Sequence, residues 1–250
     1  MRHYGIIGFP LHHSFSAKYF NEKFETSGID AEYSLYAVDK GEWMKGERLK
    51  KFLESLDGFN VTLPYKQAII PYLARLDETA EAIGAVNVVY KHVGYNTDCL
   101  GFMGSMQLLL RDDDRKALVL GTGGASKAVC YGLRKLGIIP TLVSRTPKEG
   151  MLGYDELTQE VMEAHTIIVN CTPLGMAPDV NSFPPIPYEQ ITARHLLFDC
   201  IYNPEETLFL QKGKVQGATI KNGMEMLVGQ AKAAWKIWNS DKDKHTINIG

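Results

Sequence analysis

A glycine-rich turn constrains the fold of this chain more than any other feature. Residues 121–126 read GTGGAS, follow a short apolar run and precede a helical pattern. Gly121 permits a tight turn at the end of a strand, and Gly123 lets the backbone approach a pyrophosphate. The small side chains of Ala125 and Ser126 let the next helix pack close to the sheet. This context predicts a nucleotide-binding strand–turn–helix unit, although any such turn favours glycine.

The end of the next predicted strand indicates which nucleotide binds. In folds that bind NAD, an acidic residue about 20 positions after the first glycine contacts the ribose 2′-hydroxyl group. Here the predicted strand at residues 139–143 is followed by SRTPK, which contains Arg145 and Lys148 and no acid. Basic side chains suit a 2′-phosphate, so the sequence predicts NADP(H) as the cofactor.

Composition limits the classes of function. The chain has 250 residues, enough for one large domain or two small ones, and 45% of them are hydrophobic. A formal net charge of -2 argues against a nucleic-acid-binding surface. Four cysteines, never in a CxxC spacing, are typical of thiols in a reducing compartment and predict neither disulfides nor a metal site. No signal peptide or membrane span is evident, so we expect a soluble, cytoplasmic protein without membrane partners.

Short apolar runs alternate with helical patterns, which predicts an α/β fold with parallel sheets and helices on both faces. The charged run at residues 111–116 is typical of a solvated loop and marks the entry to a second domain. The last helix is expected to pack on the first domain. The expected strands are residues 4–8, 31–38, 58–63, 87–93, 117–120, 139–143, 166–170 and 195–200. The expected helices are residues 14–27, 42–56, 99–110, 127–136, 154–164 and 224–238, with two short ones between 63 and 87.

Polar residues follow several predicted strands, at the ends where open α/β sheets bind ligands. Ser14 and Ser16 begin the first helix and suit either helix capping or hydrogen bonds to a polyhydroxylated ligand. His12 and His13 precede them without a carboxylate partner in register, and we interpret them as surface histidines.

Two motifs of the first half carry a candidate proton-transfer pair. Residues 60–66 read NVTLPYK, and the proline suits the first turn of a helix. Lys66 would then project over an interdomain cleft, with an exposed helix lysine as the alternative. Asp98 ends the segment NTD and suits either an Asx turn or a helix cap. If Lys66 and Asp98 meet, the pair can exchange a proton with a substrate hydroxyl group.

Three segments of the second half end near the same expected ligand edge. Residues 170–176, NCTPLGM, form a loop that can close over a nicotinamide ring. Tyr202 follows the last long strand and offers its hydroxyl group, and Gln230 lies about two turns into the last helix.

In this order, the motifs resemble the shikimate dehydrogenase family from Gly8 to Gln230. The resemblance rests on the serine pair, NVTxPxK at 60–66, GAxN at 84–87, NTD at 96–98, GxGGAS at 121–126, Arg-Thr at 145–146, NxTPxGM at 170–176 and the closing Gly-Met…Gln. It implies a metal-free enzyme that reversibly reduces 3-dehydroshikimate to shikimate with NADPH, a step towards aromatic amino acids. It also implies an N-terminal three-layer α/β substrate-binding catalytic domain of residues 1–101 and 222–250, and a Rossmann-like, doubly wound NADP-binding domain of residues 102–221.

The resemblance assigns roles to individual residues. It implies that Lys66 and Asp98 are the catalytic pair. The implied substrate contacts are Ser14, Ser16, Thr62, Asn87, Tyr202 and Gln230. The implied cofactor contacts are Gly121, Gly123, Gly124, Ala125, Ser144, Arg145, Thr146, Thr172 and Gly223.

The chain departs from the family pattern at two positions, and two alternatives stay open. Val88 stands where the family usually has Thr, and Ser144 where it usually has Asn. One alternative is a quinate/shikimate dehydrogenase with a wider pocket, against which Ser16 argues because a bulkier Thr is expected there. The other is a non-catalytic NADP-sensing module. The expected partner is a small-molecule substrate, with no nucleic acid, and a homodimer is left open.

Overall fold

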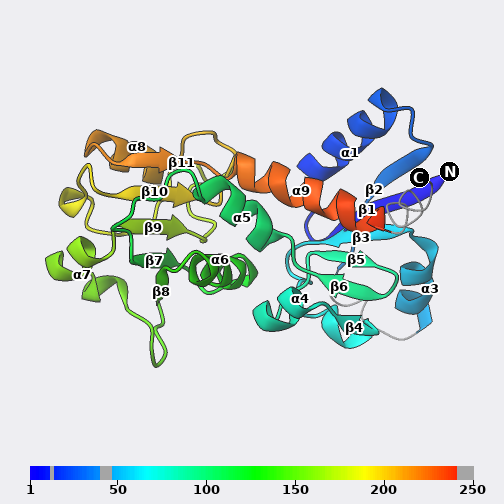
Figure 1. Ribbon diagram of the computed structural model, residues 1–250, viewed down its shortest axis with the longest axis horizontal. Coiled ribbons are helices and arrows are strands. Elements are labelled where there is room, and N and C mark those ends of the chain that lie inside the picture. Colours follow the sequence, from blue (N-terminus) through cyan, green and yellow to red (C-terminus); the bar gives the residue numbers. More distant parts are fainter. Residues whose placement is uncertain (12–13, 40–46, 241–250) are drawn as a thin grey trace, which may run out of the picture. The chain divides into compact units, whose positions relative to one another are not determined.

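The computed structural model describes residues 1–11, 14–39 and 47–240. The chain divides into two compact units. Unit 1 comprises Met1–Thr97 and the chain from Ala231 onward, and unit 2 comprises Asp98–Gln230. The elements of each unit can be followed in Figure 1. Among the described residues, no helix is long and apolar enough to span a bilayer. The predicted histidine pair at 12–13 lies outside the described residues, as does the start of the predicted helix 42–56.

Unit 1 contains a six-stranded sheet of order β2-β1-β3-β5-β6-β4. Its strands are β1 (Arg2–Gly8), β2 (Ala31–Ala37), β3 (Gly58–Val61), β4 (Arg75–Leu76), β5 (Val88–Tyr90) and β6 (Val93–Tyr95). β1 pairs in parallel with β2 and β3, whereas β5 is antiparallel to β3 and to β6. The expectation of an all-parallel sheet is therefore wrong for this unit, because its last strands return through a hairpin.

The hairpin corrects the prediction of a single strand over residues 87–93. Lys91 and His92 both have positive φ, 49° and 59°, and form the two-residue turn between β5 and β6. Type I′ turns, which are common in two-residue hairpins, require positive φ at both central residues, and Gly or Asn normally marks them in a sequence. Lys91 and His92 carry no such signal, so the sequence predicted one continuous strand over residues 87–93.

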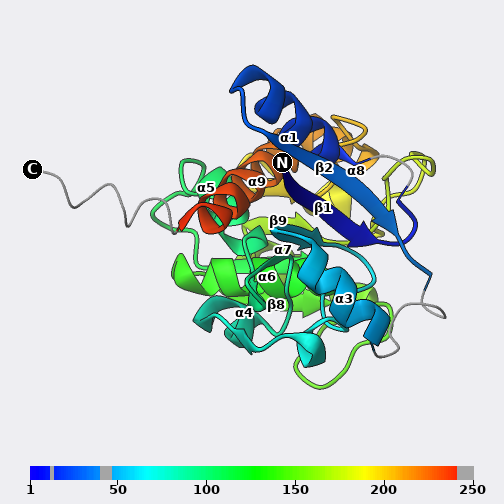
Figure 2. The same ribbon diagram turned by 90° about the vertical axis from the view of Figure 1, so that its right-hand side faces the viewer.

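Helices cover both faces of the sheet in unit 1. One face lies under α3 (Glu47–Ser55) and α4 (Glu78–Ile83) and buries Ile7, Phe59 and Val89. The opposite face lies under α1 (Phe15–Thr26) and α9 (Met224–Trp238) and buries Tyr4, Ile6 and Val88. Figure 2 shows α1 and α3 on opposite sides of β1 and β2. Because α9 places Ala231, Ala234 and Trp238 in this core, the expected packing of the last helix on the first domain is confirmed.

Unit 2 contains a five-stranded, wholly parallel sheet of order β11-β10-β9-β7-β8. Its strands are β7 (Lys116–Leu120), β8 (Ile139–Val143), β9 (Ile167–Asn170), β10 (Leu196–Asp199) and β11 (Thr219–Lys221). α5 (Asp98–Met106) and α6 (Gly124–Lys135) pack on one face, and α7 (Gln159–Ala164) and α8 (Leu208–Val215) on the other. Short 3-10 helices are η1 (Ile70–Tyr72) in unit 1, and η2 (Tyr154–Glu156) and η3 (Tyr188–Gln190) in unit 2. The predicted α/β class is confirmed, and α8 and β11 were not predicted.

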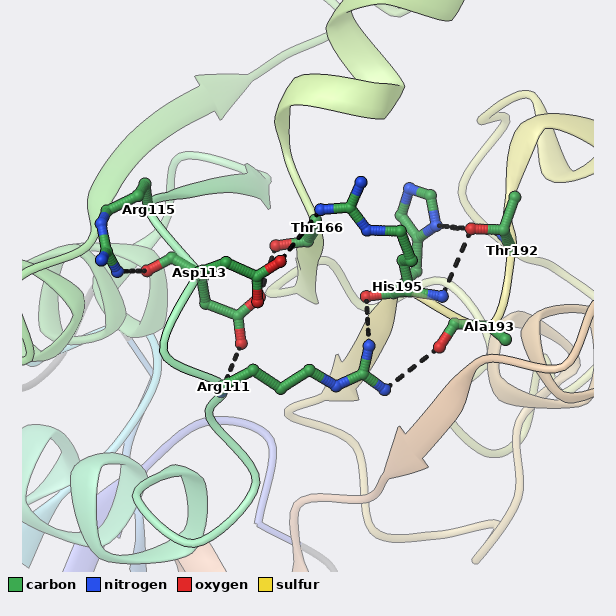
Figure 3. Close-up of polar contacts among 9 residues, drawn as sticks. Arg111, Asp113, Arg115, Thr166, Thr192, Ala193 and His195 are labelled. Atoms are coloured by element: carbon green, nitrogen blue, oxygen red, sulfur yellow. Dashed lines mark hydrogen bonds and ion pairs between the residues drawn. The ribbon is translucent and has the colours of Figure 1, made fainter.

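The charged run at residues 111–116 is anchored to the rest of unit 2 (Figure 3). Asp114 is buried, and its carboxylate accepts hydrogen bonds from the Arg111 backbone N–H at 2.8 Å and the Thr166 hydroxyl group at 2.5 Å. The Arg111 guanidinium donates to the carbonyl oxygen of Ala193 at 3.1 Å. The expectation of a solvated loop is therefore wrong for Asp114, which ties the entry of β7 to the entry of β9.

Candidate active site

Sheet topology brings the polar motifs of unit 1 to one edge. β1 and β3 are parallel, so their carboxyl ends lie together, and β5 begins at the same edge because it is antiparallel to β3. Asn60 is in register with Val88, and Val88 with Tyr95. Asn87, before β5, and Thr97, after β6, therefore flank the end of β3.

A buried hydrogen-bond network joins these segments. The Tyr33 hydroxyl group donates to Asn60 Oδ1 at 2.6 Å, and Asn60 Nδ2 donates to the Asn87 carbonyl oxygen at 3.1 Å. Asn87 Oδ1 accepts from the Thr97 backbone N–H at 2.7 Å, and Asn87 Nδ2 donates to Thr97 Oγ1 at 3.0 Å. Ser16 is buried on α1. One of the predicted substrate contacts, Asn87, thus belongs to this network.

Backbone hydrogen bonds hold Thr62 and Lys66 at the edge of the sheet where β1 and β3 end. The Thr62 N–H donates to the Ile7 carbonyl oxygen at 2.9 Å, and the Lys66 carbonyl oxygen accepts from the Val86 N–H at 2.7 Å. Gly8 leaves room for Thr62, whose methyl group would lie 2.4 Å from any Cβ at that position. The helix expected after the proline is absent from this described segment, where turns lead instead to η1. Thr62 and Lys66 are both half-buried.

The remaining predicted residues of the substrate site are distributed over both units. Ser14 is half-buried at the N-cap position of α1, and its side chain accepts no capping hydrogen bond from the described helix. Asp98 is buried at the first position of α5, directly after the anchored Thr97. Tyr202 is half-buried on the loop after β10, and Gln230 is buried in α9. The Lys66–Asp98 pairing and the substrate contacts stay predictions.

In unit 2, the glycine turn has the geometry that the sequence predicts. Gly121 follows β7 with a φ of 102°, a conformation that side chains disfavour. A Cβ there would lie 3.1 Å from the Thr172 methyl group and 3.3 Å from the Cys171 backbone. Gly123 is the N-cap residue of α6, so the first N–H groups of this helix face the turn. The turn sits where β8 and β9 flank β7, the strand-order reversal at which such sheets bind dinucleotides.

Asp199 organises the ends of β9 and β10. Its carboxylate accepts hydrogen bonds from Asn170 Nδ2 at 3.1 Å, the Ile201 N–H at 3.0 Å and the Thr207 hydroxyl group at 2.6 Å. Burial raises the pKa of Asp199 to about 6, although these hydrogen bonds act in the opposite direction. Asn170 Oδ1 in turn accepts from both the N–H and the hydroxyl group of Thr172, at 3.0 and 2.7 Å. The loop that carries Thr172 is therefore fixed from within the sheet.

The residue before α9 contacts the loop that follows β10. The Gly223 N–H donates to the Ile201 carbonyl oxygen at 3.0 Å. A Cβ at Gly223 would lie 2.4 Å from the Cys200 carbonyl oxygen, so only glycine fits there. Cys200 Sγ lies 3.7 Å from Cys171 Sγ on the neighbouring strand end. The predicted cofactor residues Gly121, Thr172 and Gly223 thus lie on adjoining loops.

The segment after β8 presents basic side chains to solvent. Ser144 is buried, and its hydroxyl group accepts from the Thr146 N–H at 3.2 Å, which forms a tight turn. Arg145 and Lys148 are exposed. A turn fixed by Ser144 leaves the Arg145 guanidinium available to an anionic group. Among the described residues, no three His, Cys, Asp or Glu side chains are grouped to hold a metal ion.

Comparisons with known proteins agree on one family. A family model described as the shikimate dehydrogenase substrate binding domain matches residues 6–89. The shikimate dehydrogenase (NADP(+)) of Clostridium beijerinckii is 41% identical over 257 residues, which cover 95% of this chain and 92% of the relative.

Solved structures show the same likeness. A chorismate mutase/shikimate 5-dehydrogenase fusion protein from Clostridium acetobutylicum superposes with a TM-score of 0.85 at 34% identity, covering 96% of this chain and 92% of that one. Shikimate 5-dehydrogenase from Thermus thermophilus, solved with NADP(H) and shikimate, gives a TM-score of 0.84 at 28% identity, covering 96% of this chain and 94% of that one.

Proposed function

Because the chain belongs to the shikimate dehydrogenase family, we propose that it is an NADP-dependent oxidoreductase that reversibly reduces 3-dehydroshikimate to shikimate in aromatic amino-acid biosynthesis. The observation that carries this proposal is the match to NADP-dependent relatives along nearly the whole chain. That match includes both the polar edge of unit 1 and the glycine turn of unit 2.

The residues of unit 2 fit NADP(H). Gly121 is a position that a Cβ would crowd, and α6 begins directly after the turn, which suits a pyrophosphate. We assign the pyrophosphate to Gly121, Gly123, Gly124 and Ala125, the 2′-phosphate to Ser144, Arg145 and Thr146, and the nicotinamide end to Thr172 and Gly223. When bound, the reduced cofactor supplies the hydride.

The residues of the polar edge supply orientation and a proton. We assign the carboxylate and hydroxyl groups of the substrate to Ser14, Ser16, Thr62, Asn87, Tyr202 and Gln230. Lys66 donates a proton to the oxygen that becomes the new hydroxyl group, and Asp98 orients Lys66 and the neighbouring substrate hydroxyl. The hydrogen bonds that hold the Asn87 side chain favour its role in orienting the substrate, because a preorganised contact loses little freedom when the substrate binds.

The proposal also covers the domain boundaries, the cellular location and the oligomeric state. We assign residues 1–101 and 222–250 to the substrate-binding catalytic domain and residues 102–221 to the NADP-binding domain. We place the enzyme in the cytoplasm, and fractionation of cells that produce it tests this. Sedimentation of the purified protein decides between a monomer and a homodimer.

The decisive experiment follows NADPH absorbance with 3-dehydroshikimate as substrate, and the reverse reaction with shikimate and NADP⁺. We expect turnover in both directions. Tight NADPH binding without turnover would instead support a sensing module. Quinate and NAD⁺ belong in the same assay, and a kcat/KM for quinate equal to that for shikimate would contradict the assignment of shikimate as the specific substrate.

A further inference from the structure

We propose that Asp199 is a positioning residue of the cofactor site, acting on the Thr172 loop through the side chain of Asn170. The inference rests on the proposed function, because it concerns the orientation of a predicted cofactor contact. Asp199 and Asn170 end neighbouring parallel strands, are in register and are fully buried. They can therefore affect a bound ligand only through the residues that they hold.

The carboxylate of Asp199 determines which way the Asn170 amide faces. An ionised carboxylate only accepts hydrogen bonds, so the Asn170 atom that lies 3.1 Å from Asp199 Oδ1 must be Nδ2. The same Nδ2 donates to the Leu174 carbonyl oxygen at 3.3 Å. Asn170 Oδ1 therefore faces Thr172, whose N–H and hydroxyl groups both donate to it, at 3.0 and 2.7 Å. A reversed amide would place its oxygen against the carboxylate and its NH₂ group against the Thr172 N–H.

The orientation of Asn170 in turn fixes the Thr172 hydroxyl group. Its one proton is donated to Asn170, and its oxygen accepts from the Leu174 N–H at 3.2 Å. Thr172 therefore offers a ligand a hydrogen-bond acceptor and not a donor. Its methyl group lies against the glycine turn, where a Cβ at Gly121 would be only 3.1 Å away. A shift of Thr172 would thus disturb both the proposed nicotinamide contact and the turn to which we assign the pyrophosphate.

Asp199 is itself held by further hydrogen bonds. Its Oδ1 also accepts from the Ile201 N–H at 3.0 Å, and its Oδ2 accepts from the Thr207 hydroxyl group at 2.6 Å. Both carboxylate oxygens are engaged, so the group cannot rotate without breaking several hydrogen bonds. Burial raises the pKa of Asp199 to about 6, and above that pH the carboxylate is ionised and only accepts. Measurements at about pH 8 therefore keep Asp199 in this state.

The first test measures amide hydrogen exchange by NMR in the protein without cofactor. Asp199→Ala releases the Asn170 amide, so exchange at the Thr172 N–H should accelerate about three- to tenfold, the effect of one lost hydrogen bond. The N–H groups of Cys171 and Cys200, which donate to backbone carbonyl groups of neighbouring strands, should exchange as in wild type. Equal acceleration at all three groups would indicate general loosening of the sheet and contradict the proposal, as would wild-type exchange at Thr172.

The second test measures NADPH binding by fluorescence titration at about pH 8. Asp199→Ala should raise the Kd for NADPH and the KM for NADP⁺ about three- to tenfold, while KM for shikimate stays within about twofold of wild type. Asp199→Asn should restore NADPH binding, because its amide oxygen can still accept from Asn170 while its nitrogen faces the Thr207 oxygen. Unchanged NADPH binding in Asp199→Ala, or no recovery in Asp199→Asn, would overturn the proposal.

Thr207→Val is the matched control. It keeps the shape of the side chain and removes one hydrogen bond from the same carboxylate, but at Oδ2, which is not the oxygen that holds Asn170. The protein should lose stability, whereas the Kd for NADPH should stay within about twofold of wild type. A Kd raised as much as in Asp199→Ala would show that the effect does not pass through Asn170, against the proposal.

Asn170→Ala keeps the proposal testable if Asp199→Ala folds poorly. It removes the amide between Asp199 and Thr172 and leaves the carboxylate bonded to Ile201 and Thr207. The Kd for NADPH should rise as in Asp199→Ala, and an unchanged Kd would count against the proposal. Adding Asp199→Ala to Asn170→Ala should raise the Kd little further, and full additivity would contradict action through Asn170.

The outcomes separate this inference from the proposed function. If the wild-type enzyme does not turn over shikimate with NADP⁺ at all, the proposed function fails. If it does, and only the effects of the Asp199 and Asn170 variants on amide exchange and NADPH binding are missing, this inference alone fails.

Discussion

At the scale of single residues, the proton-donor role that we propose for Lys66 can be tested with one substitution. If Lys66 supplies the proton, Lys66→Ala should lower kcat by about 10²- to 10⁴-fold, because general acid–base catalysis contributes about that much. Shikimate binding, measured by calorimetry, should change only a few-fold. Lys50→Ala, an exposed lysine on α3, serves as the control and should have wild-type kinetics. A near-normal kcat in Lys66→Ala would remove Lys66 from the mechanism.

We propose that Arg145 sets the preference for NADP(H) over NAD(H). A charge-assisted hydrogen bond contributes about 1.5–3 kcal/mol, so Arg145→Ala should weaken NADP(H) binding about ten- to a hundredfold. NAD(H), which lacks the 2′-phosphate, should bind as before. Fluorescence titration with both cofactors checks this, with Arg134→Ala on the exposed end of α6 as the control. Equal losses for NADPH and NADH would show that Arg145 does not contact the phosphate.

We expect Asp199 to make the stability of unit 2 depend on pH. Its folded-state pKa of about 6 lies above the ordinary value of 3.8. The proton is therefore bound more tightly in the folded state, and the stability that this contributes is complete below about pH 4 and lost as the pH rises to about 6. We expect the free energy of unfolding of wild type, relative to Asp199→Asn, to fall by about 2–3 kcal/mol over this interval. Urea unfolding at several pH values measures the difference, and a constant difference would refute the assignment.

At the scale of elements, the β5–β6 hairpin stores conformational strain. Left-handed backbone costs about 1 kcal/mol or more at a residue other than Gly or Asn, and the turn has two such residues. Replacing Lys91 by Asn and His92 by Gly should therefore raise the free energy of unfolding by about 1 kcal/mol, without changing kcat. Denaturant unfolding measures this. Gly28, with a φ of 60° and open space around it, is the converse control, and Gly28→Ala should destabilise the protein.

The sequence predicted the helices and strands that are long enough to show a recognisable apolar pattern. Each parallel strand of unit 2 from β7 to β10 is a short apolar run, and each appears where it was expected. β4 has only two residues and β11 three, too few for any periodicity. The expected helix 154–164 is instead η2 and α7, separated by Leu157 and Thr158, and the Thr158 hydroxyl group caps α7. The helix-capping residue Thr158 lies inside an apparently continuous helical pattern, and the sequence analysis overlooked it.

In the candidate site too, the sequence predicted the residues that lie in loops and missed those that lie in strands. Asn87, Thr172 and Gly223 lie in motifs at strand or helix ends, where polar residues stand out in the sequence. Tyr33 and Asp199 act from inside strands and have no motif of their own. Their one visible signal is a polar group in an otherwise buried stretch, which needs a partner wherever it is buried. The identity of that partner depends on strand pairing, which the sequence does not state.

At the scale of the whole molecule, the polar edge of unit 1 and the glycine turn of unit 2 should respond separately to the two ligands. A ligand at 100 times its Kd stabilises the state that binds it by about 2.7 kcal/mol. NADPH should therefore slow amide exchange chiefly at residues 121–126 and 170–175 of unit 2. Shikimate alone should do so at residues 60–66 and around Asn87 of unit 1. Hydrogen exchange followed by mass spectrometry resolves these peptides, and protection of 60–66 by NADPH alone would contradict the assignment of the two sites.

The shared helix α9 has a consequence for how the protein is made. Met226 near its start belongs to a core of unit 2, whereas Ala231, Ala234 and Trp238 belong to a core of unit 1. A ribosome delivers these last residues long after β1 to β6 have emerged. The nascent unit 1 therefore lacks the part of the core over Tyr4 and Phe20 that α9 supplies until α9 emerges, and the continuous unit 2 can finish folding first.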